Sequence, residues 1–238
     1  MKMAISIMIT GLIALGTISN VLALNINDDI VTKSDIIFRD DFDSESDYWF
    51  WRDTYTAHHT FEDGNVKFTI PNAHRRGFHV SEIWDNNTSP IYKYNNMEIR
   101  LKVDNISRGS KGWGFWNTDL NPFNCSLAWF IFQVNNNIFY PMKGLWIMVM
   151  DGNPFKISLK RIRGVNIREW HTYDINWTEN HVDFYVDNEL VAHVTKSVPQ
   201  VSCRLHVWND NAAWYFIPIF QRILRSSSLF VDYLEITE

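Results

Sequence analysis

Three stretches in the C-terminal third decide the fold: Glu169-Trp-His-Thr-Tyr-Asp-Ile-Asn-Trp177, His181-Val-Asp-Phe-Tyr-Val-Asp-Asn-Glu-Leu-Val191 and Leu229-Phe-Val-Asp-Tyr-Leu-Glu-Ile236. Apolar and polar residues alternate in each, which is typical of a strand that buries one face. The Asp187-Asn188 pair stands between two such runs, where a tight two-residue turn forms a hairpin. These stretches predict antiparallel strands joined by short turns.

Similar short runs recur along the chain, separated by clusters of Asn, Asp, Gly and Ser, and no convincing helical periodicity follows the first 23 residues. This spacing predicts an all-β fold, a two-sheet antiparallel β-sandwich. No repeat or linker divides the chain, so we expect a short leader at 24–35 and one domain at 36–238. The expected strands are Ile36–Asp41, Asn65–Ile70, Phe78–Trp84, Asn96–Val103, Gly112–Asn117, Ala128–Val134, Leu145–Met150, Phe155–Ile162, Trp170–Trp177, Val182–Val186, Leu190–Thr195, Cys203–Trp208, Trp214–Ile219 and Ser228–Ile236.

Residues 1–23 have the pattern of a secretory signal peptide: a basic start at Lys2, an apolar stretch from Met3 to Ile18 and a small-residue cleavage site ending at Ala23. We expect a protein that is secreted or held at the cell surface; the alternative is an uncleaved membrane anchor. Five Asn-x-Ser/Thr sequons are candidates for glycosylation, at Asn86, Asn87, Asn105, Asn124 and Asn176.

The net charge is −5, and without Lys2 the remaining 21 basic residues face 27 acidic ones. This balance gives no electrostatic reason to expect nucleic acid or an anionic membrane as partner. Aromatic residues make up 15% of the chain, with 11 Trp and 16 Phe, enough for a core with aromatic rings left over for another role. We expect a monomer.

Several motifs resemble glycoside hydrolase family 16 and the wider concanavalin A-like lectin/glucanase superfamily. They follow the family's order over nearly the whole mature chain. The motifs are Phe38-Arg-Asp-Asp-Phe-Asp43 followed by Tyr48-Trp49, Met97-Glu-Ile-Arg-Leu-Lys-Val103, Gly112-Trp-Gly-Phe-Trp-Asn117 and Val231-Asp-Tyr-Leu234. The resemblance implies a jelly roll with a concave groove, and a partner among polysaccharides such as β-glucans or galactans.

The resemblance also implies a Glu-x-Asp-x-Glu run on the strand after Gly112–Asn117, where one carboxylate acts as nucleophile and another as acid/base. Here that strand reads Ser126-Leu-Ala-Trp-Phe-Ile-Phe-Gln-Val134, without a carboxylate, and no Glu-x-Asp-x-Glu occurs anywhere in the chain. We therefore expect carbohydrate binding without hydrolysis.

Tryptophan rings stack on the apolar faces of sugars, while polar neighbours hydrogen-bond the hydroxyls. By alternation, the candidates for the concave face are Trp113, Trp129, Gln133, Arg204, His206 and Trp208. One alternative is an active glycoside hydrolase that uses Glu82, Asp85 and Asp210. Another is a structural or adhesive surface protein whose concave face binds protein.

Two further expectations concern ions and thiols. The resemblance implies a structural calcium at Asp232, held with backbone carbonyls near the N-terminus, and no other cofactor. The eight histidines are scattered without the spacing of a zinc site. Cys125 and Cys203 either close a disulfide after export or remain buried free thiols.

Overall fold

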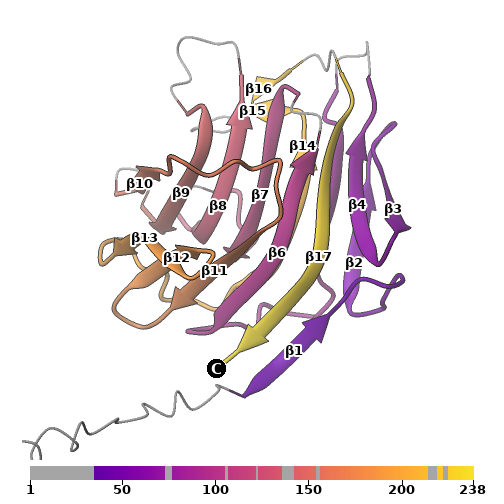
Figure 1. Cartoon of the computed structure of the whole chain (residues 1–238). Coiled ribbons are helices and arrows are strands. Elements are labelled where there is room, and N and C mark those ends of the chain that lie inside the picture. Colours follow the sequence, from indigo (N-terminus) through magenta and orange to yellow (C-terminus); the bar gives the residue numbers. More distant parts are fainter. Residues whose placement is uncertain are drawn as a thin grey trace, which may run out of the picture. The chain divides into compact units, whose positions relative to one another are not determined.

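Two antiparallel sheets lie face to face in the computed structural model (Figure 1). The structure describes residues 35–72, 77–104, 107–121, 123–135, 142–153, 156–213, 219–221 and 225–238, within one compact unit, Ser34–Glu238. Every regular element of these residues is a strand. The predicted all-β sandwich is confirmed, whereas the signal peptide, the leader up to residue 34, the sequon at Asn105 and most of the expected strand Trp214–Ile219 lie outside the described residues.

The first sheet contains the three stretches that decide the fold. Near the end of the chain marked C in Figure 1, β1 (Ile36–Asp40) pairs with the C-terminal half of β17 (Ser227–Thr237). The order along the sheet is β13 (Glu189–Val194), β12 (Val182–Val186), β11 (His171–Trp177), β6 (Asn96–Asp104), β17 (Ser227–Thr237), β4 (Asn65–Ile70) and β3 (His58–Glu62), with β1 (Ile36–Asp40) added to β17.

The second sheet carries the candidate site. Its order is β10 (Ser158–Arg161), β9 (Gly144–Asp151), β8 (Ser126–Val134), β7 (Gly109–Trp116), β14 (Arg204–Asp210), β5 (Val80–Asp85) and β2 (Trp49–Asp53). A short separate pair is formed by β15 (Ala212–Ala213) and β16 (Ile219–Phe220).

Alternation places the core between the two sheets. On β6, Met97, Ile99 and Leu101 are fully buried, while the residues between them are half-buried. Across the interior, the rings of Trp113 on β7 and Tyr173 on β11 meet at 4.7 Å between centroids. The pattern that predicted strands from sequence is thus the pattern that fills the sandwich.

The predicted hairpin turn is confirmed. Asp187 and Asn188 have φ values of 51° and 65°, and Val186 pairs directly with Glu189 across them. Positive φ at both central residues is the mark of a type I′ turn, whose twist matches that of the flanking strands.

Besides the two-residue strand β15, two strands of the main sheets were not predicted from the sequence, β2 and β3. Each lies at the edge of its sheet; the burial of β2 is irregular, and β3 alternates only between exposed and half-buried positions. An edge strand packs on fewer neighbours, so its sequence shows the apolar alternation only weakly.

Candidate functional site

On the second sheet, the face that points away from the core also carries many apolar side chains. A second buried cluster lies there and includes Leu127, Trp129, Ile131, Met148 and Trp208. β8 is therefore buried on both faces. Within this face is a pocket of about 620 Å³, lined mainly by residues of β5, β7, β8 and β14.

Aromatic rings form one wall of the pocket. Trp129 and Trp208 pack edge to face at 4.8 Å between centroids, and Trp116 packs against Trp129 at 5.6 Å. His206 stacks on Trp208 at 5.2 Å. The Trp208 ring lies over Gly112, its cross-strand partner on β7. Only glycine leaves room for the ring, because a Cβ at residue 112 would occupy the same space.

These rings differ in how far a ligand can reach them. Trp129 and Trp208 are only 7% and 3% exposed, although both line the pocket. Trp84 and Trp116 are half-buried at its rim, and Trp84 stacks on the exposed Phe50 at 4.5 Å. The accessible stacking surface is therefore offered by Trp84 and Trp116, with Trp129 and Trp208 as their support.

A chain of polar side chains crosses the pocket. Glu82 accepts a hydrogen bond from His206 Nε2 at 2.8 Å through Oε2 and pairs with Arg52 at 2.9 Å through Oε1. Since His206 donates from Nε2, its neutral form has an acceptor at Nδ1. His206 Nδ1 and Trp129 Nε1 are buried without a hydrogen-bond partner in the described part of the chain. Trp116 Nε1 is buried without a partner in the same way, so the lining residues hold one acceptor and two donors that no described residue pairs.

The other two carboxylates considered from sequence hold the protein together. Asp85 Oδ2 accepts the backbone N–H of Leu205 at 2.9 Å, and Arg204 donates to Asp85 as well. Asp210 Oδ1 accepts from the backbone N–H and the hydroxyl of Ser110, at 3.1 and 2.8 Å. Glu82 and Asp210 line the pocket and Asp85 does not.

The structure brings four of the six predicted binding residues into one pocket: Trp129, Arg204, His206 and Trp208. The predicted position of Trp113 is wrong, because its side chain is fully buried in the sandwich core. Gln133 is 1% exposed and lies outside the lining of the pocket.

Sequence reasoning missed six lining residues, among them Arg52, Trp84 and Trp116. Trp84 had a usable signal, because it alternates with Glu82 on a predicted strand. Arg52 lies on the unpredicted strand β2, and Trp116 follows Trp113 at a spacing that puts the two rings on opposite faces of β7.

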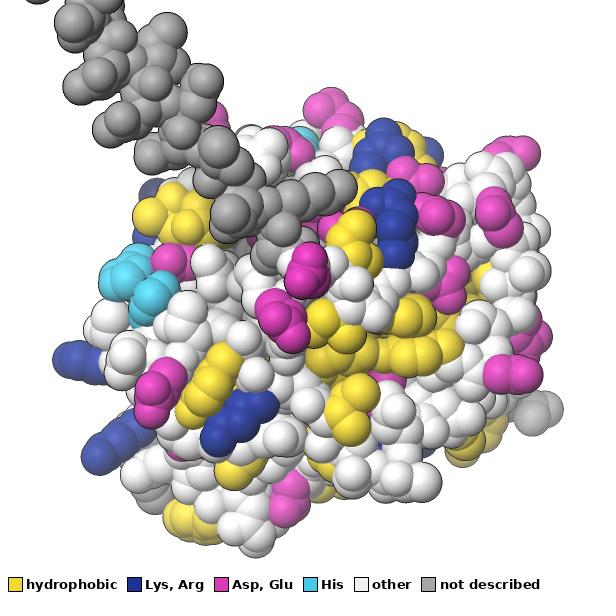
Figure 2. Space-filling model, turned by 90° about the horizontal axis from the view of Figure 1, so that it is seen from below, with side chains coloured by type: hydrophobic (Ala, Val, Ile, Leu, Met, Phe, Trp, Pro, Cys, Tyr) yellow, Lys and Arg dark blue, Asp and Glu magenta, His cyan; other side chains and the backbone are white. Residues whose placement is uncertain are grey.

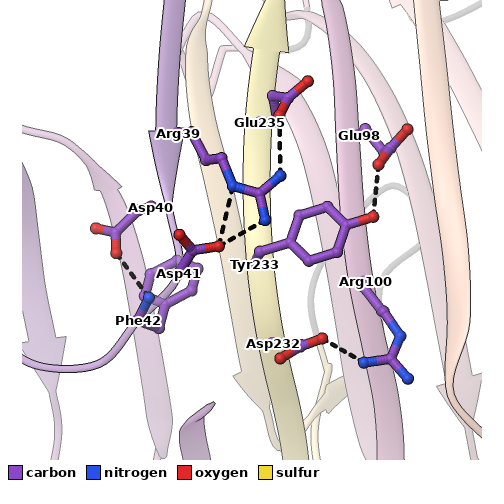
Figure 3. A network of polar contacts seen from close by, with 9 residues as sticks. All are labelled: Arg39, Asp40, Asp41, Phe42, Glu98, Arg100, Asp232, Tyr233 and Glu235. Carbon is purple, nitrogen blue, oxygen red and sulfur yellow. Dashed lines mark hydrogen bonds and ion pairs between the residues drawn. The ribbon is translucent and has the colours of Figure 1, made fainter. Parts of the chain in front are cut away.

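The polar network around Asp232 lies on the first sheet (Figure 3). Asp232 is paired with Arg100, Tyr233 donates to Glu98, and Arg39 pairs with Glu235 at 2.9 Å. Arg100 supplies the positive charge that the predicted calcium would supply. Calcium at Asp232 stays a prediction.

Both cysteines are buried free thiols in the structure. Burial raises the pKa of Cys125 to about 11 and also raises the pKa of Cys203. Such thiols are poor nucleophiles. Their pairing after export stays a prediction.

Charges of both signs are interspersed among small hydrophobic patches on the face shown in Figure 2. Among the described residues visible there, Lys and Arg side chains are scattered between acidic ones. No helix in the described ranges has the length and apolar character needed to span a bilayer.

The fold is a jelly roll of the glycoside hydrolase family 16 type, as the motifs predicted. The sequence profile described as Glycosyl hydrolases family 16 matches residues 156–212, which run from before β10 to β15. No curated protein matches the sequence.

Solved structures with this fold act on glycans. The chain is similar to the GlcNAcα1-4Gal releasing endo-β-galactosidase from Clostridium perfringens, with a TM-score of 0.61 and 19% identity over 85% of this chain; it spans 61% of that protein's length. It is also similar to the Bacillus licheniformis β-glucanase (TM-score 0.60, 14% identity, 84% of this chain and 97% of that one). A β-1,3-glucanase from Mycobacterium marinum is similar to the same degree (0.60, 13%, 86% and 99%). At these identities the similarity establishes the fold.

Proposed function

We propose that this chain is an exported polysaccharide-binding protein that does not hydrolyse its ligand. The observation that carries the proposal is the outer face of β8. Its residues in alternation are Leu127, Trp129, Ile131 and Gln133, so the strand offers apolar, aromatic and amide groups where the resemblance implies carboxylates. An amide has no proton to give to a leaving group, and hydrolysis with retention needs two carboxyl groups about 5–5.5 Å apart.

The pocket has the composition of a sugar site. Trp84 and Trp116 offer ring faces at the rim, and Glu82, Arg52 and His206 offer polar groups beside them. A pyranose presents an apolar face and a ring of hydroxyl groups, so flat aromatic surface next to a few polar groups is the complementary arrangement.

Of the two pocket carboxylates considered from sequence, Glu82 and Asp210, Glu82 is held by the side chains of two other pocket residues. Both of its oxygens are engaged, one by His206 and the other by Arg52. These contacts stabilise the carboxylate and fix its position, which supports a role in holding His206 and the ligand.

The ligand class follows from the fold. The similar structures include an endo-β-galactosidase and β-glucanases, so β-galactans and β-glucans are the first polysaccharides to test. The signal-peptide pattern of residues 1–23 supports export, which would bring the protein into contact with such polymers.

The test is native electrophoresis of the mature chain through gels that contain laminarin, lichenan, agarose or xyloglucan, followed by staining of the polysaccharide. Retarded migration without clearing is the expected result in at least one gel. Clearing around the band would show hydrolysis, and Glu82→Gln would then be the first variant to test for its loss. Unchanged migration in all four gels would contradict binding to these classes.

Variants locate the site. Trp84→Ala or Trp116→Ala is expected to weaken binding about 30-fold, which corresponds to ~2 kcal/mol for the loss of an aromatic anchor. Trp170→Ala is the matched control, because Trp170 is also half-buried but lies against Arg100 and Lys102 of the first sheet. Equal weakening by all three variants would refute the pocket as the binding site.

A further inference from the structure

Two histidines and an aspartate meet on the hairpin formed by β12 and β13, away from the pocket. Asp183 and His193 are direct cross-strand partners, and His181 immediately precedes β12. Because residues 181 and 183 are two apart near the start of one strand, their side chains lie on the same face as His193. The register thus gathers three side chains whose outermost members, His181 and His193, are twelve residues apart in sequence.

The three side chains converge on one point. One ligand atom from each of His181, Asp183 and His193 lies within 4.8 Å of the other two. The distance from His193 Nδ1 to Asp183 Oδ1 is 2.6 Å, and that from His181 Nε2 to the other oxygen, Oδ2, is 3.3 Å. Two ligands at 2.0–2.2 Å from a tetrahedral zinc ion are about 3.3–3.6 Å apart. The His181–Asp183 distance matches this separation, whereas the His193–Asp183 distance is that of a hydrogen bond and lengthens by up to about 1 Å when an ion enters.

A neighbouring hydroxyl orients one of the rings. His181 Nδ1 contacts Thr178 Oγ1 at 3.0 Å, which leaves Nε2 directed at Asp183. The turn that carries both residues is closed by the backbone bond from Thr178 N–H to the carbonyl of His181, at 2.9 Å. A hydrogen bond to the second ring nitrogen is the usual support of a metal-binding histidine.

The arrangement differs from the other close histidine–aspartate pairs. His171 pairs with Asp187 at 2.6 Å, and His59 pairs with Asp53 at 2.8 Å. Within the described ranges, neither pair has a third ligand, and the group at His181 is the single set of three such side chains. An ion pair with a carboxylate requires only one histidine. Two imidazoles on the Asp183 carboxylate instead provide the three ligands that a bound metal ion requires.

We propose that His181, Asp183 and His193 bind a divalent transition metal ion such as Zn²⁺. Imidazole nitrogens and one carboxylate oxygen match the ligand preference of zinc, and three protein ligands leave a fourth position for water. His193 is 53% exposed, so an ion reaches the site and the ring adjusts to it. The ion joins β12 to β13, the edge strand of the first sheet, and holds this hairpin closed.

The test is calorimetric titration of the untagged mature chain with ZnCl₂ after treatment with EDTA and removal of the chelator. One equivalent of Zn²⁺ is expected to bind and to raise the Tm. His193→Ala and His181→Ala are each expected to weaken binding by more than the ~10-fold that loss of an outer hydrogen-bond partner causes. His171→Ala, at an exposed pair of the same kind without a second histidine, is expected to bind like the wild type.

Two results would overturn the proposal: a wild type that binds Zn²⁺ no more tightly than ~1 mM, or binding that both triad variants retain. Both histidines are partly exposed, so the variants are expected to keep the wild-type Tm without metal, and this is measured first. Polysaccharide binding is measured separately on the same variants, so failure of the metal site leaves the pocket untouched.

Discussion

The position of Trp208 over Gly112 makes a sharp prediction for the Gly112→Ala variant. A Cβ at residue 112 would lie 2.1, 2.2 and 2.7 Å from three carbons of the Trp208 ring. Ordinary carbon contacts are about 3.5–4.0 Å, so the ring has to move by more than 1 Å. Gly112 is not in the left-handed backbone region, so alanine adds no backbone strain that would confuse the result.

The ring has little room to move. It packs against Trp129 at 4.8 Å and His206 at 5.2 Å, and its Nε1–H donates to Ser110 Oγ at 3.0 Å. Overpacking of a buried site costs about 1–3 kcal/mol, and loss of the hydrogen bond adds about 1 kcal/mol. In a domain of this size each kcal/mol lowers the Tm by about 2–4 °C, so we expect a decrease of about 5–15 °C.

Calorimetry of Gly112→Ala, Trp208→Ala and the double variant measures this effect. Once the indole is absent, the added methyl group has space, so Gly112→Ala is expected to change the Tm little in the Trp208→Ala background. The coupling free energy is expected to be about 2 kcal/mol. Gly77→Ala is the control, because its Cβ would meet the exposed, adjustable ring of Tyr55 at 3.2 Å. Additive Tm changes in the double variant would refute the stacking of Trp208 on Gly112.

Three further predictions concern buried titratable groups. Burial and the charge of Glu98 raise the pKa of Asp174 to about 7. Between about pH 4 and pH 7 the native state therefore keeps a proton that the unfolded chain has released, and the stability of the protein falls as the pH rises through this range. Asp174→Asn should therefore have a higher Tm than the wild type at pH 8, with the difference shrinking towards pH 5; a constant difference would contradict this. Burial lowers the pKa of Lys111 from 10.5 to about 8. Between these two pH values the side chain is protonated in the unfolded chain but neutral in the native protein, so the stability of the protein rises with pH there. Lys111→Met should lose that gain and have a Tm at pH 7 equal to or above that of the wild type, since an unpaired buried charge is removed; a clear decrease would count against it. Cys125 and Cys203 should resist iodoacetamide in the native protein and take two adducts after denaturation, whereas adducts that need prior reduction would reveal a disulfide.

The fold could be predicted from the sequence because strands that bury one face show the burial in their alternation. The type I′ turn at Asp187-Asn188 fixed the register of one hairpin, and the motif order supplied the jelly roll. Edge strands such as β2 and β3 could not be found this way, since exposed positions accept polar residues on both faces.

The site was harder to predict because alternation tells which residues of one strand share a face, but not how two strands are aligned. Trp113 pairs with Phe130, and Trp129 pairs with Gly114. The two tryptophans are therefore one position out of phase and point to opposite sides of the sheet. The same limit hid the metal-binding candidates, because the proximity of His181 and His193 depends on the register of the β12–β13 hairpin.

The hydrogen bonds of the pocket support the proposal that this protein binds its polysaccharide without hydrolysis. Asp210 accepts from the Ser110 hydroxyl, and Ser110 in turn accepts from Trp208 Nε1. Glu82 fixes His206, whose ring stacks on the other side of the same cluster. Asp210 acts on the Trp208 ring through Ser110, and Glu82 acts on it through His206, so both pocket carboxylates help to hold this ring in place. A carboxylate that acts as nucleophile or proton donor has to change partners during the reaction, whereas a stacking platform gains affinity from rings that are already rigid. The arrangement of these charges therefore supports the proposal of a preorganised binding surface.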